Sequence, residues 1–397
     1  MQGVVLPSIV SELEESGFRI PDFKNSNLSL MKEFAEGKGR HLKSGKKKAV
    51  LIIDGLGYDT LDKAAKSDKK LSEFIGRNTL EKASTIFPSF TPSVIISLNS
   101  GKYVSEHGIT GDFFSKDYGT MINPFRLSWM PSSEEIDGLA PMLMPRPSVL
   151  ERIRSRGRFA YLMRDQVLEK EMRSDFCKGL RYVPHTGNED LFVGMESLLK
   201  KGDFDFMYAY TDALDHFSHR YSKSGSETVR LVARLFRDIM ELEEKLRKSD
   251  TELFIFSDHG QIVVDKKLKT NVLWNDELMK FLEMPVFGNG RSFSMKIVDG
   301  KEKGFEDYFE RKYSKKAALF DTEELVKAGI FGSKKLSEFA RYNLADKTGI
   351  ALGNNTFSFN DYNRSRGKAA NPRISENMGT HGGMNPEEIE IPILRIG

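Results

Sequence analysis

The sequence predicts an α/β protein with a doubly wound, mostly parallel sheet sandwiched by helices and with an inserted α+β cap subdomain. The apolar run 49–53 stops at Asp54, as at the carboxyl end of a strand buried on both faces. Two later runs, 204–210 and 251–257, have the same form and are separated by a long amphipathic segment. This alternation is typical of a doubly wound sheet. Residues 265–375 lack it, which indicates an insertion.

The composition is that of a chain with enough apolar residues to bury a hydrophobic core. Its 397 residues are 39% hydrophobic and 29% charged, and the formal net charge of +3 is too small to indicate a nucleic-acid duplex as partner. A single cysteine, Cys177, excludes an intrachain disulfide. The N-terminus shows no secretory signal, and no apolar run approaches the roughly 20 residues that span a bilayer. We therefore expect a cytoplasmic protein without a membrane partner, while its oligomeric state is not indicated.

The chain opens with a predicted helix. Residues 4–17 show helical spacing from Pro7 onward, and Gly17 ends the pattern. Residues 18–45 are polar, so we expect an arm that lies over the core. The predicted domains are an N-terminal helical arm at 1–45, the α/β core at 46–264 and 376–397, and the inserted cap at 265–375.

Helices and strands alternate through the predicted core. Residues 60–76 form a helix, and another begins near Pro92, because proline is favoured at the first helical position. Residues 112–145 hold many aromatic residues and prolines without a clear period, which indicates loops bordering a pocket. The other predicted elements of the core are helices at 148–156, 188–201 and 227–248 and a strand at 159–163.

Shorter elements are predicted for the cap and the C-terminus. Residues 388–394 return the chain to the core as a strand, and Pro392 predicts that this strand lies at the edge of the sheet. The predicted elements of the cap are strands at 291–298 and 317–320 and helices at 304–313 and 322–327.

Carboxylates and imidazoles follow the ends of the predicted strands. Three of the seven histidines lie beside aspartates, glycines and strand ends. Mixed carboxylate and imidazole ligands suit zinc or manganese, and six of them with one hydroxyl suffice for two ions. The candidate ligands are Asp54, Asp215, His219, Asp258, His259 and His381.

Thr91 stands at the predicted N-cap of the helix that begins near Pro92. Its hydroxyl then lies where the helix dipole and the free N–H groups favour an anion. By itself the segment favours an ordinary capping threonine. The neighbouring ligand set points instead to a nucleophile whose pKa a metal ion would lower.

Five motifs together resemble the alkaline phosphatase superfamily, and most closely its type I phosphodiesterase/nucleotide pyrophosphatase branch. The resemblance covers about 47–262 and 377–396, and the cap segment 323–332 also looks like that of prokaryotic members. It implies an alkaline-phosphatase-like core. The motifs are Asp54-Gly-Leu-Gly-Tyr, Phe87-Pro-Ser-Phe-Thr91 with Glu106-His107-Gly-Ile, Asp215-His-Phe-Ser-His219-Arg-Tyr, Ser257-Asp258-His259-Gly and Thr380-His381-Gly.

The resemblance implies two divalent metal ions, zinc or else manganese, and a covalent intermediate on Thr91. An Asp-to-His spacing of four occurs both as Asp212/His216 and as Asp215/His219, and the second pair matches the family because His219 is followed by Arg-Tyr. The implied ligands are Asp54, Asp258 and His259 with Thr91 for one ion, and Asp215, His219 and His381 for the other. His107 would structure its loop and bind no metal.

The activity implied is hydrolysis of phosphodiester or nucleotide pyrophosphate bonds in a small-molecule phosphoester or nucleotide. Nucleotide pyrophosphatases often carry an asparagine three residues after the nucleophile, where this chain has Val94. Ser93 or a backbone N–H would then bind the phosphoryl oxygen. Phe113 and Phe114 would form a substrate-binding wall. No arginine lies near Thr91 in sequence, which favours diesters, because monoesters carry a second charge that calls for an arginine clamp.

Related activities stay open at this point. The same superfamily includes phosphomonoesterases, phosphonate hydrolases and cofactor-independent phosphosugar mutases, and the mutases need a lid that excludes water. An arginine of the cap, such as Arg291 or Arg364, would reverse the diester preference. A binding protein that kept the fold without catalysis is the alternative from another class, and its metal content would distinguish it.

Overall fold

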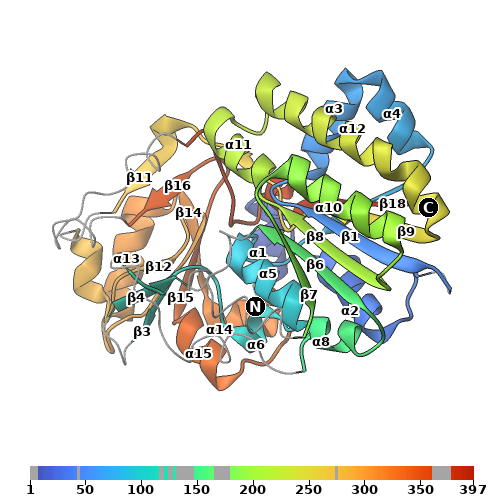
Figure 1. Ribbon diagram of the computed structural model, residues 1–397. Coiled ribbons are helices and arrows are strands. Elements are labelled where there is room, and N and C mark those ends of the chain that lie inside the picture. The colour runs from blue at the N-terminus through green and yellow to red at the C-terminus, as the bar shows by residue number, and fades with distance from the viewer. Residues whose placement is uncertain are drawn as a thin grey trace, which may run out of the picture.

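The computed structural model describes residues 8–42, 45–115, 120–123, 128–130, 147–164, 179–272, 276–359 and 377–397. A seven-stranded sheet lies between layers of helices, and a smaller α+β unit adjoins it (Figure 1). The strand order is β2 (Thr79–Ser84), β18 (Glu390–Ile396), β9 (Thr251–Phe256), β1 (Lys47–Ile53), β8 (Phe206–Thr211), β6 (Phe159–Arg164) and β7 (Arg181–His185). The five strands from β9 to β7 are parallel, so the predicted mostly parallel α/β fold is confirmed.

Strand β1 is continuously apolar from Ala49 to Ile53 because it is buried on both faces of the sheet. Leu51 and Ile53 join the hydrophobic core on one face of the sheet, whereas Val50 and Ile52 join the core on the other face. One face is covered by α3 (Tyr58–Ser67), α4 (Lys69–Gly76), α10 (Asn188–Lys201) and α12 (Ser226–Lys248). The opposite face is covered by α1 (Ile9–Glu15), α2 (Asn27–Glu36), α5 (Thr91–Ser100), α6 (Val104–His107) and α8 (Val149–Arg154).

The N-terminal segment is more than a polar arm. Helix α2 begins at a capping box formed by Ser26 and Ser29 and ends at Gly37 in the left-handed conformation. Its apolar face is buried in the core, where Phe34 packs edge-on against Phe206 and Phe254. The expectation that residues 18–45 lie over the core as a polar arm was therefore wrong for this helix.

Strand β18 lies inside the sheet, between β2 and β9, so the edge position predicted from Pro392 was wrong. The ladder between β18 and β9 covers only Ile393 to Ile396, whereas Pro392 is paired in register with Lys82 of β2. Pro392 thus has a strand neighbour on one side only, and its missing N–H breaks no ladder hydrogen bond with β9.

Part of the segment 112–145, which we expected to be loops, forms a three-stranded antiparallel sheet of β3 (Phe113–Ser115), β4 (Thr120–Asn123) and β5 (Ser128–Met130). This small sheet lies next to the inserted unit, because the N–H of Gly288 donates to the carbonyl of Asp112 over 2.8 Å. The two segments are far apart in sequence and lie side by side in Figure 1.

The inserted unit has its own core and a four-stranded sheet in the order β12 (Phe287–Gly288), β13 (Ser292–Met295), β15 (Lys347–Ala351) and β14 (Ala317–Asp321). Its helices are α13 (Glu302–Tyr313), α14 (Thr322–Lys327) and α15 (Glu338–Leu344), with a 3-10 turn η2 (Glu277–Phe281). The predicted strands and helices of the cap are present, while β15 and α15 were not predicted. The exact domain boundaries stay a prediction.

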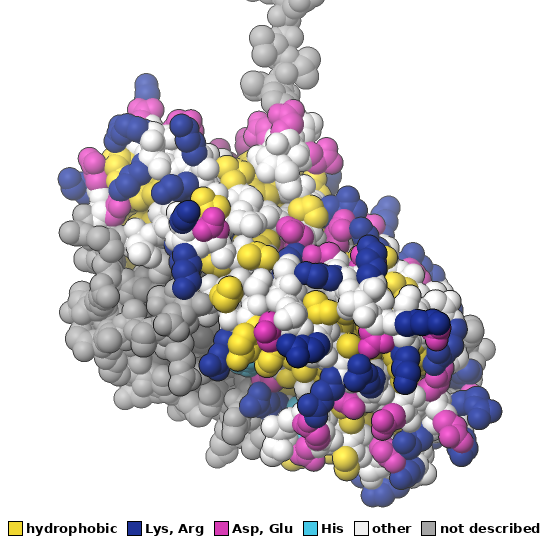
Figure 2. All heavy atoms as spheres, turned by 90° about the horizontal axis from the view of Figure 1, so that it is seen from above, with side chains coloured by type: hydrophobic (Ala, Val, Ile, Leu, Met, Phe, Trp, Pro, Cys, Tyr) yellow, Lys and Arg dark blue, Asp and Glu magenta, His cyan; other side chains and the backbone are white. Residues whose placement is uncertain are grey.

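The remaining described elements are short, and several of them lie where the inserted unit joins the core. They are the 3-10 turn η1 (Lys266–Leu268), the pairs β10 (Ile262–Val263) with β17 (Gly379–Thr380) and β11 (Lys269–Asn271) with β16 (Thr356–Ser358), and the helices α11 (Ala213–Tyr221) and α17 (Pro386–Ile389). The face seen in Figure 2 mixes basic and acidic side chains without a continuous basic stripe. Among the described helices, none is both long and apolar enough to cross a bilayer.

Candidate metal centre

The candidate ligands gather at the carboxyl edge of the parallel strands, where α/β sheets bind their ligands. Strands β1 and β9 are neighbours, with Ile52 in register with Phe256. Asp54 follows the end of β1, and Asp258 and His259 come shortly after the end of β9. Adjacent parallel strands therefore bring Asp54 close to Asp258 and His259, although they are about 200 positions apart in the sequence.

Asp54, Asp258 and His259 form the first group, whose ligand atoms all lie within 4.8 Å of one another. Nε2 of His259 is 3.2 Å from Oδ1 of Asp54 and 3.4 Å from Oδ2 of Asp258. All three side chains are buried. Among the described residues, these two carboxylate oxygens have no hydrogen-bond partner. Buried acceptors that face each other without a donor are costly, so a cation fits this group.

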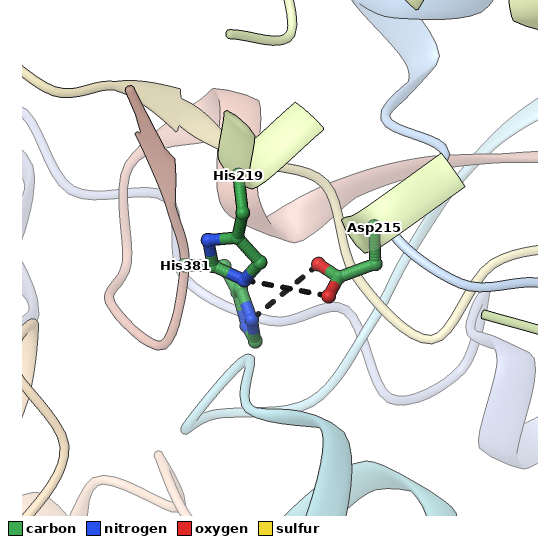
Figure 3. A group of neighbouring side chains, drawn as sticks. All are labelled: Asp215, His219 and His381. Carbon is green, nitrogen blue, oxygen red and sulfur yellow. Dashed lines mark ion pairs between the residues drawn. The ribbon is translucent and has the colours of Figure 1, made fainter. Parts of the chain in front are cut away.

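Asp215, His219 and His381 form the second group, again within 4.8 Å. Asp215 and His219 are four residues apart on α11 and so share a face of the helix. Nε2 of His219 lies 3.3 Å from Oδ2 of Asp215, and Nε2 of His381 lies 3.6 Å from its Oδ1. The three side chains point toward one another (Figure 3).

The alternative pair on α11 faces elsewhere. Oδ1 of Asp212 accepts a hydrogen bond from Arg164 over 2.9 Å. The His216 side chain is 70% exposed. Among the described groups, neither residue joins a set with metal-binding geometry, which favours Asp215 and His219 as the candidate pair.

All three histidines are oriented as a metal ligand needs, with Nδ1 held by the backbone. The Nδ1 atom of each ring lies against a backbone carbonyl: that of Gly379 for His219 (2.7 Å), of Gly260 for His259 (3.0 Å) and of Ser89 for His381 (3.1 Å). Because a carbonyl can only accept, Nδ1 carries the proton and donates. Nε2 of each ring then faces the centre, as in metal-binding histidines, and offers its lone pair when the ring is neutral.

The two groups adjoin each other. The rings of His259 and His381 stack with their centroids 3.6 Å apart and an interplanar angle of 11°. Phe90 stacks on His381 at 5.6 Å. One continuous centre therefore contains both groups.

Thr91 lies at the same centre, and its Oγ1 is 2.9 Å from Nε2 of His259. Helix α5 has Phe90 as its N-cap, so Thr91 is the first helical residue and not the N-cap, and the helix begins one residue earlier than predicted. The hydroxyl still lies at the helix N-terminus, where an anion is favoured. Thr91 is only half-buried, in contrast to the rest of α5.

Ser89 joins the loop before Thr91 to the loop that carries His381. Its hydroxyl donates to the carbonyl of Gly383 over 2.8 Å and accepts from the N–H of Gly382 over 3.3 Å. Its own carbonyl accepts the Nδ1 proton of His381. The nucleophile candidate and one ligand candidate are therefore held in a fixed relation.

Burial and crowded carboxylates shift the pKa values of the centre. Burial, followed by the charges of Asp258 and Asp215, raises the pKa of Asp54 well above its usual range. Burial and the charge of Asp215 raise the pKa of Asp258 to about 6. Burial lowers the pKa of His259 to about 4. Metal binding would relieve the crowding of these carboxylates.

The histidines of the second group differ in pKa. Burial, followed by the charge of His259, lowers the pKa of His381 to about 3. Burial also acts to lower the pKa of His219, but its ion pair and hydrogen bond with Asp215 outweigh this and raise the pKa to about 9. A metal ion that binds here at neutral pH must therefore displace a proton from His219.

The predicted substrate-binding residues are not shown in contact with either ligand group in the described part of the chain. Ser93 is fully buried in the first turn of α5, and its hydroxyl has no hydrogen-bond partner among the described residues. Phe113 and Phe114 lie in β3, but their side chains are outside the described part of the chain. Their roles in substrate binding stay predictions. His107 contacts Ser97 and the N–H of Ile109, away from both metal groups.

Two residues that sequence reasoning missed bind the candidate ligands directly. The hydroxyl of Tyr210, at the end of β8, donates to Oδ2 of Asp54. Nε2 of Gln261 donates to Oδ1 of Asp215 over 2.5 Å. The available signals were their positions: Tyr210 ends a strand at the ligand-binding edge, and Gln261 directly follows the Asp258-His259-Gly motif.

The fold and the centre together define an alkaline-phosphatase-like protein: a doubly wound sheet whose carboxyl edge gathers aspartates, histidines and a threonine at a helix N-terminus. The family model of type I phosphodiesterase/nucleotide pyrophosphatase matches residues 49–317, more than half of the chain. The chain therefore belongs to this hydrolase family of the alkaline phosphatase superfamily.

Solved structures support the same fold. An inactive murine ectonucleotide pyrophosphatase/phosphodiesterase 5 in complex with AMP has a TM-score of 0.64 at 14% identity over 88% of each chain. Phosphonoacetate hydrolase from Sinorhizobium meliloti, in complex with phosphonoacetate, has a TM-score of 0.65 at 17% identity, covering 88% of this chain and 89% of that one. Identities this low establish the fold alone. No curated protein sequence matches the chain.

Proposed function

We propose that the chain is a two-metal hydrolase that cleaves phosphodiester or nucleotide pyrophosphate bonds through a covalent intermediate on Thr91. The main support is the position of the Thr91 hydroxyl, 2.9 Å from Nε2 of His259 and at the N-terminus of α5. A threonine with only a structural role at the start of the helix would not need to lie among buried carboxylates and imidazoles. Membership of the phosphodiesterase family supports the same reaction class.

The residues present fit two divalent ions, for which zinc is our first choice and manganese our second. One ion would be held by Asp54, Asp258 and His259 with Thr91, and the other by Asp215, His219 and His381. Bound ions would supply Lewis acidity, which lowers the pKa of the attacking hydroxyl and balances charge on the leaving oxygen.

The chain's own groups then arrange the reaction. The Thr91 oxygen approaches phosphorus from the N-terminus of α5, where the helix dipole favours the anionic phosphoryl group. The bond from Thr91 to phosphorus forms as the bond to the ester oxygen breaks, and that oxygen takes up a proton in place of the one that the hydroxyl gives up. Water later cleaves the bond from Thr91 to phosphorus: its oxygen joins phosphorus, and one of its protons restores the hydroxyl. Ser93, two positions further on and with an unpartnered hydroxyl among the described residues, is the candidate to bind a phosphoryl oxygen.

A preference for diesters follows from the arginines around the site. Arg291, which we considered as a clamp from the cap, is fully buried and bonded to Glu388 through Nε (3.0 Å) and Nη2 (2.9 Å). It is therefore not available to a substrate. Arg164 is engaged by Asp212, and Arg364 lies outside the described residues. A diester carries one charge on its nonbridging oxygens, which two ions and a helix N-terminus can balance without a clamp.

The test is a comparison of kcat/KM for bis-p-nitrophenyl phosphate, a nucleotide p-nitrophenyl ester and p-nitrophenyl phosphate, with zinc or manganese supplied. We expect at least tenfold higher values for the best diester than for the monoester, and loss of activity with a chelator. Phosphonoacetate belongs in the panel because of the structural similarity to phosphonoacetate hydrolase. A tenfold preference for the monoester or for phosphonoacetate would refute the diesterase proposal.

A further inference from the structure

Gln261 lies where three of the four ligand-bearing segments of the centre meet. It follows Asp258 and His259 in sequence, and its side chain is fully buried. Its Nε2 is 2.5 Å from Oδ1 of Asp215 and 3.4 Å from the backbone carbonyl of the same residue. A residue attached to the first group by the chain thus reaches a ligand candidate of the second group by its side chain.

Gln261 also packs against the segment that leads to His381. A Cβ at Gly379 would collide with Oε1 of Gln261, and the carbonyl of Gly379 is the acceptor for Nδ1 of His219. Strand β10, which begins at the next residue, pairs with β17, and Ile262 is in register with Thr380. The position of Gln261 is therefore linked to Asp215 and to the segment that orients His219 and carries His381.

The hydrogen bond fixes the Asp215 carboxylate in a defined rotation. Its Oδ2 faces Nε2 of His219 at 3.3 Å, and its Oδ1 faces Nε2 of His381 at 3.6 Å. One N–H donated to Oδ1 leaves lone pairs on both oxygens for a metal ion. Hydrogen bonds of this kind to metal-binding carboxylates typically change metal affinity about 10- to 100-fold.

We propose that Gln261 is a positioning residue that sets the affinity of the Asp215/His219/His381 group for a divalent ion. The inference rests on the proposed function, because it presupposes that this group binds metal. The chain offers a matched control at the other group, where the hydroxyl of Tyr210 donates to Oδ2 of Asp54.

The experiment is a titration of metal-free protein with zinc, followed by calorimetry or by competition with a chelating dye. Each substitution is placed in two backgrounds: Asp258→Ala, which keeps the second group, and His381→Ala, which keeps the first. In the Asp258→Ala chain, Gln261→Met should weaken zinc binding about 10- to 100-fold, whereas Tyr210→Phe should change it less than threefold. In the His381→Ala chain we expect the reverse: Tyr210→Phe should weaken zinc binding about 10- to 100-fold, and Gln261→Met should change it less than threefold.

Gln261→Leu provides a second variant of similar size that cannot donate the hydrogen bond and adds no metal ligand, and we expect at least a tenfold loss in the Asp258→Ala chain. Thermal unfolding of each metal-free variant identifies any variant that does not fold. If one Gln261 variant fails to fold, the zinc affinity of the other Gln261 variant tests the inference. If the folded Gln261 variants bind zinc as tightly as the background, the inference is wrong while the proposed function stands. If the unsubstituted chain binds no zinc or manganese, both are wrong.

Discussion

The hydroxyl of Thr91 and Nε2 of His259 are in contact in the centre. The first is the candidate nucleophile and the second is a candidate metal ligand. His259 presents the lone pair of Nε2 because its Nδ1 proton is held by the carbonyl of Gly260. Thr91 Oγ1 donates to that lone pair in the structure described. A divalent ion would replace this proton at the same place, so the geometry suits a threonine whose hydroxyl becomes a metal-bound nucleophile.

Substitution of Thr91 separates catalysis from folding. We expect Thr91→Ala to fold and to keep its metal ions, because three protein ligands remain in the first group. Turnover should fall by roughly 10³-fold or more, since the covalent route is lost. Thr91→Ser is the matched control, because it keeps a hydroxyl at the helix N-terminus and should retain measurable turnover. Diesterase rates and metal content of both variants check this, and an unimpaired Thr91→Ala enzyme would reduce Thr91 to an ordinary helix residue.

Single residues differ in how well the sequence predicts them. Asp54 and Asp258 were predictable as strand-end carboxylates, because an apolar run ending in an aspartate marks the carboxyl edge of a parallel sheet. Tyr210 and Gln261 were not predicted as partners of these ligands. An isolated polar residue has no periodicity, and whether it binds a carboxylate depends on which strands become neighbours. Such partners become evident only from the three-dimensional packing.

Helices α5 and α6 are joined by a buried histidine. The N–H of Ile109 donates to Nδ1 of His107, so the proton of the neutral ring is on Nε2, which donates to Oγ of Ser97 over 2.8 Å. Burial lowers the pKa of His107 to about 3. Because the usual value is near 6.5, the unfolded chain binds a proton in a pH range where the folded chain does not. The stability that depends on neutral His107 is therefore present above pH 6.5 and is lost as the pH falls toward 3.

This gives a pH prediction for the metal-free protein. Between pH 7 and pH 5, His107 should remove roughly 2 kcal/mol from the free energy of unfolding. His107→Gln lacks this titration, so the stability difference between the unsubstituted protein and the variant should shrink by about that amount. Urea unfolding of both proteins in a chelator at the two pH values measures it, and the other titrating groups cancel in the difference. A difference that stays constant with pH would show that His107 does not account for the acid sensitivity.

The misassignments of α2 and β18 have different causes. Helix α2 lies in a segment whose polar composition conceals apolar residues at helical spacing, including Leu30, Met31 and Phe34. The spacing was a usable signal. Strand β18 was placed at the edge because of Pro392, although a proline at the end of a ladder is tolerated inside a sheet. Strand order depends on long-range pairing, which local sequence does not determine.

The inserted unit is anchored to the sheet through the loop that carries His381. Arg291 and Glu388 are both fully buried and form an ion pair, and Glu388 also accepts the N–H groups of Gly383 and Asn385. The hydroxyl of Ser292 donates to the carbonyl of Gly382 over 2.7 Å. Separating these buried charges would be strongly unfavourable. The described part of the inserted unit is thus part of the scaffold of the centre, and Arg291, held by Glu388, does not serve as a swinging clamp.

The predicted alternation of strands and helices was sufficient to give the α/β class, and the five motifs were sufficient to give the family. It was insufficient to show how the insertion meets the core, because Arg291 and Glu388 are 97 positions apart and nothing local pairs them. The same holds for the arrangement of the two ligand groups, which only the order of β9, β1 and β8 brings together.

The most direct test of the account is the metal content of the purified protein and of two variants, measured by elemental analysis after incubation with zinc or manganese and gel filtration. We expect two ions per chain, and one ion per chain in both Asp258→Ala and His381→Ala, because each substitution removes a ligand from one group only. Chelation of the unsubstituted protein should abolish diester hydrolysis, and added metal should restore it. An unchanged metal content in both variants, or activity that survives chelation, would contradict the account.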